Sequence, residues 1–143
     1  MPRPLALLGF ALLALFGAGC AQITREGHGD LSRFQRIYVE QRLNDNRGVH
    51  RMIVAELTAL GYRADSGWMT MMPEDTQLVV TYDVRETWDF RPYVIELNAD
   101  VRPAKDYNRI VANTHYFRPG ITNKKTEDMV HELITKLFPR AKK

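Results

Sequence analysis

Cysteine is almost absent from this chain of 143 residues, which has one, at position 20. A lone cysteine excludes an internal disulfide. The chain also lacks a P-loop, a G-x-G-x-x-G fingerprint, a C-x-x-C pair and a G-x-S-x-G turn. His131-Glu132 begins like a zinc-protease motif, but Thr135 stands where the second histidine is needed. No cofactor or metal is therefore predicted.

Long apolar runs are equally scarce. The run from Leu5 to Phe16, even when extended to Cys20, is shorter than the ~20 residues of a transmembrane helix, and no basic cluster follows it. Arg3 precedes it, and the small residues 17–19 follow it. A positive charge, an apolar core and small residues, in that order, are typical of an export signal, here residues 1–19.

The residues Gly17-Ala18-Gly19-Cys20 resemble the lipobox of bacterial lipoproteins, with glycine where that family usually has leucine. The resemblance implies a diacylglycerol on the Cys20 sulfur, cleavage before Cys20 and an acyl chain such as palmitate on the new amine. Ala21 is not the aspartate that retains enteric lipoproteins in the inner membrane, which favours the outer membrane, facing the periplasm. The alternative is an ordinary secretory signal cut after Gly19.

Charge of one sign does not dominate. The formal charge is +3, and removal of residues 1–19 takes away only Arg3, leaving 124 residues with a charge of about +2. That length suits one domain with a real core. Because no basic stripe with interleaved aromatics is present, we do not expect nucleic-acid binding.

Patterning divides the mature chain into the lipidated cysteine with a tether (20–33), one domain (34–139) and a basic tail (140–143). Alternating apolar residues predict strands at 34–40, 77–90, 93–102 and 107–118, with a break at Arg91-Pro92 and a hairpin turn at 103–106. Helical spacing predicts helices at 46–60, capped by Gly61, and from Thr122 or Asn123 to 137. The expected fold is α+β, a two-layer sandwich of a mostly antiparallel sheet of about four strands with two helices on one face.

This layout resembles a domain-of-unknown-function family of bacterial lipoproteins. The matching stretches are Leu57-Thr-Ala-Leu60-Gly61-Tyr62, the strand Thr76-Gln-Leu78-Val79-Val80-Thr-Tyr82 and the closing Leu137-Phe138-Pro139. The order of elements is also similar to the lipopolysaccharide-assembly lipoprotein LptE, the TolB N-terminal domain and the LpoB activator. The resemblance implies a protein that works by contact, and it transfers no catalytic residue.

The best candidate for an enzymatic site is a group of acidic side chains on the solvent-exposed face of the predicted sheet: Asp83, Asp89, Glu96 and Asp100. Paired carboxylates can hydrolyse glycosidic bonds in peptidoglycan. However, Arg85, Arg102 and Arg109 are available to neutralise them, as is usual on an exposed sheet. Glu86 falls on the apolar face by strict alternation, which predicts a β-bulge or a strand end there.

Aromatic and methionine side chains supply the predicted partner-binding surface, formed by a hairpin end plus a methionine-rich loop: Trp68, Met71, Trp88, Phe90, Arg91 and Tyr93. The same residues are also compatible with covering the edge of the core, and the loop methionines with Cu(I). We therefore expect a lipid-anchored, non-enzymatic interaction or assembly module with an envelope protein partner. The alternatives are a lipid- or glycan-binding groove between helices and sheet and, more distantly, a peptidoglycan hydrolase.

Overall fold

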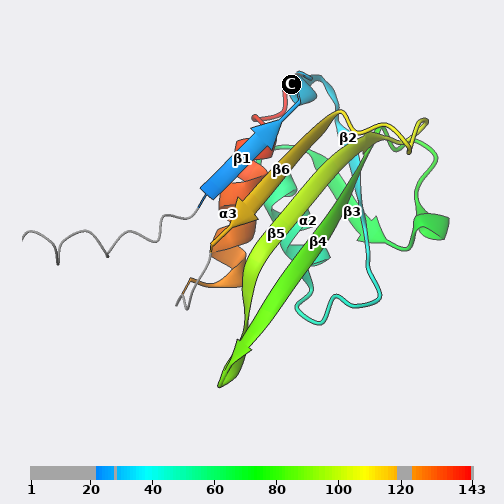
Figure 1. Cartoon of the computed structure of the whole chain (residues 1–143). Helices are drawn as coiled ribbons and strands as arrows, with labels where there is room; N and C mark the ends of the chain where they lie inside the picture. The colour runs from blue at the N-terminus through cyan, green and yellow to red at the C-terminus, as the bar shows by residue number, and fades with distance from the viewer. Residues whose placement is uncertain (1–21, 28, 119–123, 143) are drawn as a thin grey trace, which may run out of the picture.

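Six strands and two helices form the part of the chain that the computed structural model describes, residues 22–27, 29–118 and 124–142 (Figure 1). Cys20 and the predicted signal lie outside these residues. The strands are β1 (Gln22–Glu26), β2 (Arg36–Glu40), β3 (Arg63–Gly67), β4 (Leu78–Asp89), β5 (Arg91–Pro103) and β6 (Ala112–Phe117). The helices are α2 (Val49–Ala59) and α3 (Thr126–Leu137), with short 3-10 turns η2 (Leu31–Arg33) and η3 (Met69–Met71).

All six strands belong to one sheet, in the order β1-β6-β5-β4-β2-β3. The pairs from β1 to β4 are antiparallel, whereas β4 with β2 and β2 with β3 are parallel. Both helices pack on the same face of this mixed sheet, and β4 and β5 extend past them as a long hairpin (Figure 1). The α+β class with two helices is confirmed, but the sheet has six strands rather than about four.

The core lies between the sheet and the helices. From β4 it takes Leu78, Val80 and Tyr82, which alternate as the sequence predicts. The apolar stripe of α3 is also buried: Met129, Val130, Leu133, Ile134 and Leu137. Full burial of one such aliphatic side chain contributes about 1.5–3 kcal/mol, so this layer is the main source of stability.

The end of α2 shows why the chain turns there. Gly61 has φ +95°, a left-handed conformation that suits glycine. The amide of Gly61 donates to the Thr58 carbonyl at 3.0 Å, and the amide of Tyr62 donates to the Leu57 carbonyl at 3.0 Å. This is the Schellman arrangement, and it confirms Gly61 as the predicted cap.

Two strands occupy segments that the sequence assigns to other structure. Residues 22–26, expected in the tether, pair with β6 as strand β1, and residues 31–33 form η2. Residues 63–67, expected to be irregular, form the parallel edge strand β3. Both strands have five residues and mostly exposed or half-exposed side chains, so they lack the strong alternation that marks β4. The folded domain therefore begins before residue 34.

Several element boundaries also differ from the prediction. The first strand starts at Arg36, and α2 spans 49–59 rather than 46–60. The return strand starts at Ala112 rather than at 107, because residues 104–111 form a loop before it. The hairpin reverses at Phe90, one residue before the predicted break, and Pro92 pairs opposite Trp88 inside the ladder. In the basic tail, the amide of Lys142 donates to the Ser32 carbonyl at 3.0 Å, and its ammonium pairs with Asp30 at 2.8 Å.

Candidate functional site

The tip of the β4-β5 hairpin carries the most exposed aromatic side chains of the described chain. Trp88 is 71% exposed and Phe90 is 95% exposed. Phe90 also has φ +58°, which is a strained conformation for a bulky residue. Phe90 is the residue at which the hairpin reverses, and tight hairpin turns require a positive φ. Arg91 and Tyr93 follow at once on β5, so four of the predicted partner-binding residues do lie together, and those two aromatics are not buried at a core edge.

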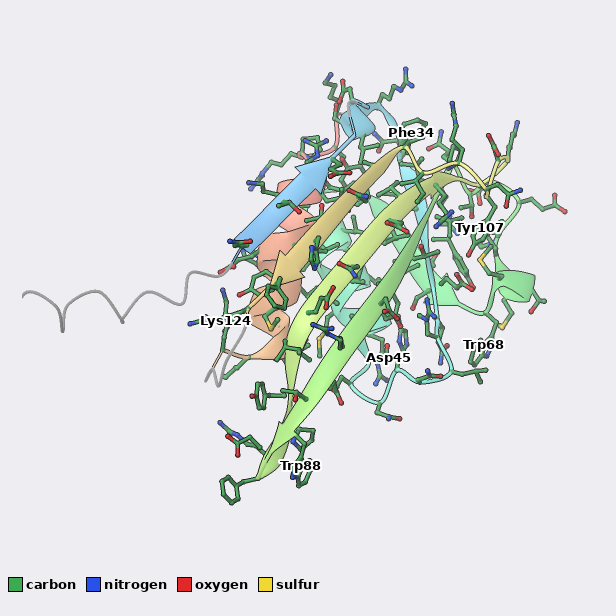
Figure 2. The ribbon with its side chains drawn as sticks, in the orientation of Figure 1. Phe34, Asp45, Trp68, Trp88, Tyr107 and Lys124 are labelled. Atoms are coloured by element: carbon green, nitrogen blue, oxygen red, sulfur yellow. The ribbon has the colours of Figure 1, made fainter. Side chains whose placement is uncertain are left out.

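Trp68 does not join that tip (Figure 2), and neither does Met71, which ends the η3 turn that follows Trp68. They lie at η3, just after β3, where Trp68 is 40% exposed and Met71 is 69% exposed. Gly67, at the end of β3, pairs with Glu40 of β2. Glu40 is one residue past Val39, which pairs with Val80, so Gly67 is level with Thr81 of β4. Trp88 is seven residues beyond Thr81, or about 23 Å at the strand rise of ~3.3 Å per residue. The expected single surface is therefore two surfaces.

The base of the hairpin is fixed by a bulge. The β4-β5 register shifts between Arg85 and Glu86, so the predicted irregularity at Glu86 is confirmed. Glu86 is partly exposed and pairs with Arg47, which precedes α2. Arg47 also donates from Nη2 to the Pro92 carbonyl at 3.0 Å. These contacts tie the hairpin to the start of α2.

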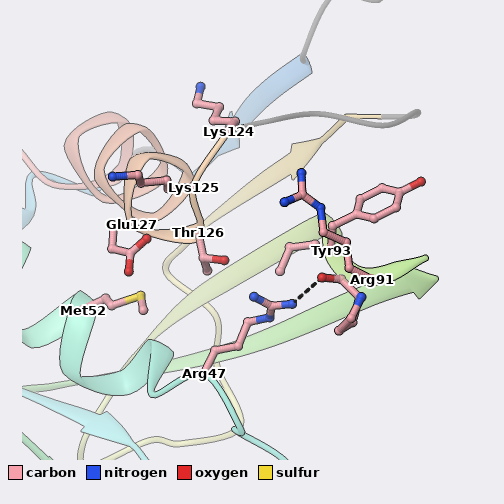
Figure 3. Close-up of a pocket in the computed structure, with 10 residues that line it drawn as sticks. Arg47, Met52, Arg91, Tyr93, Lys124, Lys125, Thr126 and Glu127 are labelled. Carbon is pink, nitrogen blue, oxygen red and sulfur yellow. Dashed lines mark hydrogen bonds between the residues drawn. The ribbon is translucent and has the colours of Figure 1, made fainter. Parts of the chain in front are cut away.

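A pocket of about 390 Å³ opens beside this base, between the start of α3 and the start of β5 (Figure 3). Its lining is Arg47, Met52, Arg91, Pro92, Tyr93, Val94, Lys124, Lys125, Thr126 and Glu127. Four cationic side chains and one carboxylate thus face the same space. No sequence motif marks this pocket, because its residues come from three segments that only the fold brings together.

Three of the four acids predicted on the outer sheet face form ion pairs, whereas Asp89 takes part in none of the ion pairs among the described residues. Asp83 lies 4.0 Å from Arg42, and Asp100 lies 3.1 Å from Arg102. Glu96 is shared between Arg85 at 2.8 Å and His115 at 2.9 Å. The neutralisation predicted for Arg85 and Arg102 is confirmed, whereas Arg109 pairs with Asp106 in the loop before β6.

Asp45 is the most densely bonded carboxylate of the described residues. Its Oδ1 accepts from the Val49 amide at 2.9 Å, and its Oδ2 accepts from the His50 amide at 3.1 Å. Oδ2 also accepts from the Tyr82 hydroxyl at 2.7 Å and lies 2.6 Å from His50 Nδ1. Burial alone raises the pKa of Asp45, but these hydrogen bonds outweigh it and hold the pKa below its usual range.

A second polar cluster covers the outer face of the sheet. The Tyr107 hydroxyl donates to Glu40 at 2.7 Å, and the Arg102 guanidinium lies 5.3 Å from the Tyr107 ring centre. Burial first, and then the hydrogen bond to Glu40, raise the pKa of Tyr107. This cluster holds the 104–111 loop against the sheet, so we assign it a structural role.

Neither a metal centre nor a membrane-spanning helix is found in the described part of the chain. No group of three or more histidine, cysteine, aspartate and glutamate residues is arranged there to hold a metal ion. None of the helices in those residues is both long and apolar enough to cross a bilayer.

No family model matches the chain, and no curated protein matches it. Two solved structures of PelC dodecamers from Paraburkholderia phytofirmans are similar, with TM-scores of 0.62 and 0.61. Each is 14% identical in sequence and covers 87% of this chain and 100% of the PelC chain. At this identity the similarity establishes a shared fold.

Proposed function

We propose that this chain is a lipid-anchored envelope protein, held at the outer membrane through Cys20, whose domain is a non-enzymatic assembly module. Its partner is a second copy of the same chain. Three observations support this: the export pattern of residues 1–20, the exposed apolar surface at η3, and a fold shared with PelC, which forms dodecamers. The resemblance to contact-acting lipoproteins points the same way.

The main support for the proposal is that Trp68 and Met71 are exposed beside β3, an edge strand of the sheet. β3 ends the sheet on this side, so its outer backbone groups have no strand neighbour within the described residues. An open strand beside exposed apolar side chains is a site for adding a strand or a partner surface. Trp68 is itself held in place, because its carbonyl accepts from the Tyr38 hydroxyl at 2.9 Å.

The two ends of the sheet favour head-to-tail assembly. β1 ends the sheet on one side and β3 on the other, and the two strands differ in sequence and in pairing direction. A contact between unlike surfaces is heterologous, and heterologous contacts generate closed rings when the rotation between copies allows it. A dodecamer, as in PelC, is one such closed assembly.

Native mass spectrometry of the lipidated chain in detergent tests this proposal. We expect a closed oligomer for the wild type and monomers for Trp68→Ala combined with Met71→Ala. Loss of one buried tryptophan anchor at an interface weakens binding by about 30-fold or more. The matched control is Trp88→Ala combined with Phe90→Ala, which should keep the oligomer. A monomeric wild type at micromolar concentration, or equal loss in both double variants, would overturn the assembly role.

A further inference from the structure

The pocket between the starts of α3 and β5 has the features of an anion site (Figure 3). Two of its cations form ion pairs with carboxylates outside the pocket lining: Arg47 pairs with Glu86, and Lys124 pairs with Glu132. These pairs fix two walls of the pocket. Lys125 takes part in none of the ion pairs formed among the described residues. Its ammonium therefore carries positive charge that no described carboxylate neutralises.

The first turn of α3 adds donors to the same pocket. Lys125 precedes this helix of 12 residues as its N-cap and makes no side-chain capping bond. The first amides of a helix lack internal partners and bear the positive end of its dipole. Together they form a natural phosphate-binding group.

Thr126 is a second and independent sign of a ligand. Its side chain lines the pocket, the residue is only 9% exposed, and its hydroxyl has no hydrogen-bond partner in the described chain. Figure 3 shows this hydroxyl directed from the start of α3 toward the β5 side of the pocket. This hydroxyl opens onto the pocket, so an anion oxygen bound there could accept a hydrogen bond from it.

The pocket lies at the end of the domain nearest to the lipid. Gln22 at the start of β1 pairs with Phe117, and Phe117 pairs with Glu96 of β5. The start of β1 is therefore at the end of the sheet from which the hairpin projects (Figure 1). Cys20 precedes Gln22 by two residues, a span of at most about 7 Å. Tryptophan side chains such as Trp88 are favoured at membrane interfaces, and phenylalanine side chains such as Phe90 occur on the apolar face of interfacial segments.

We propose that this pocket binds the phosphate of an anionic phospholipid headgroup, while Trp88 and Phe90 enter the membrane interface. The membrane is the one to which Cys20 anchors the chain, so this part of the proposal rests on the proposed lipidation. A soluble phosphate group has the same binding chemistry. Glu127 also lines the pocket, and its carboxylate opposes any anion there.

The first arm of the test measures phosphate binding alone. Inorganic phosphate is titrated into the lipidated chain in neutral detergent, with the amide resonances of Thr126 and Glu127 followed by NMR. We expect saturable shifts, binding at least fivefold weaker in Lys125→Gln, and tighter binding in Glu127→Gln. Lys136→Gln, at the other end of α3, is the matched control and should bind as the wild type does. Absence of saturable shifts, or equal weakening by Lys125→Gln and Lys136→Gln, would overturn the site.

The second arm identifies the source of the phosphate. The chain has two tryptophans, so Trp68→Phe reports Trp88 alone and Trp88→Phe reports Trp68 alone. Each lipidated variant is reconstituted into vesicles of brominated phosphatidylcholine, with or without phosphatidylglycerol. We expect bromine to quench Trp88 at least threefold more than Trp68, with stronger quenching when phosphatidylglycerol is present. Lys125→Gln should remove that lipid dependence.

The outcomes separate the proposals. Phosphate shifts without any effect of phosphatidylglycerol would keep the site and assign it to a soluble phosphate group, overturning the headgroup. Phe90→Gly relieves the strained turn, so it keeps the fold and should reduce Trp88 quenching. Failure of lipidation is read separately, from the mass of the Cys20 peptide. A failure of assembly is detected by native mass spectrometry. The outcome of the phosphate titration depends neither on membrane insertion nor on assembly.

Discussion

Replacing Asp45 with asparagine tests the claim that one carboxylate joins the start of α2 to the sheet. The side chain of Asp45 is 2% exposed, and it accepts hydrogen bonds from two amides of α2 and from Tyr82 of β4. Asparagine keeps one oxygen that accepts from the α2 amides, so it retains most of the capping contribution and removes the charge. Loss of a hydrogen bond to a charged acceptor, here the bond from the Tyr82 hydroxyl, costs about 1.5–3 kcal/mol. We therefore expect a destabilisation of about 1.5–3 kcal/mol.

Urea unfolding followed by tryptophan fluorescence measures this loss. With a slope of about 2 kcal/mol per molar, the midpoint should fall by about 1 M. The domain should stay folded in buffer, because ~120 residues give about 6–18 kcal/mol of total stability. Asp83→Asn is the control, since Asp83 is exposed and lies 4.0 Å from its partner Arg42. It should change stability by less than about 0.5 kcal/mol. Equal midpoints for the two variants would refute the reasoning.

The pH dependence gives an independent check. The pKa of Asp45 is lowered in the folded state, so its stabilisation is present above the unfolded pKa of about 3.9. It is lost as the pH falls below that value toward the folded pKa. The difference in unfolding free energy between wild type and Asp45→Asn should therefore shrink as the pH falls from about 4 to about 2. A constant difference over that range would show that the charge is not what stabilises.

Three further changes have defined outcomes. Cys20→Ser should move the protein to the soluble fraction, and an uncut variant that stays in the membrane would contradict lipidation. Gly27→Ala should loosen β1, measured by hydrogen exchange, because Gly27 has φ +104° and an added Cβ would lie 2.5 Å from the Val111 carbonyl oxygen. Gly29→Ala, with 3.8 Å of room, is its control and should exchange as the wild type does. Tyr62→Phe should cost about 1 kcal/mol in urea unfolding by removing the 2.7 Å hydrogen bond to the Pro139 carbonyl, and Tyr93→Phe should not. The buried hydroxyl of Tyr62, whose pKa burial raises to about 12, is the group under test.

The elements that the sequence predicts well are those with one buried face. β4 alternates over many residues, and α3 repeats apolar residues at helical spacing, so solvent exposure alone determines both patterns. The sequence misses β1 and β3, which are five-residue edge strands held by backbone pairing. Backbone hydrogen bonds do not depend on side-chain type. A polar stretch such as Arg63–Gly67 therefore shows no alternation even when it completes a sheet.

The candidate sites also differ in whether local sequence is enough to predict them. The exposed tip is predictable, because Trp88 and Phe90 lie next to a turn that local sequence marks. The Asp45 network and the α3 pocket are not, since each joins residues from segments far apart in the chain. Arg47 and Lys125 illustrate this: they are 78 positions apart in the sequence and line one pocket. Only long-range packing creates that neighbourhood.

The pairing of β1 with β6 changes what a lipid on Cys20 would do. A long flexible tether would let the domain take any orientation above the membrane. Because Gln22 is already fixed to Phe117, only a two-residue span would separate the anchor from a rigid sheet. An anchor that short would limit tilt, and it would hold the hairpin end of the sheet, where β1 begins, toward the bilayer. Lateral contacts between neighbouring copies and headgroup contacts beneath them would then use different surfaces, which is the arrangement that a membrane-bound ring requires.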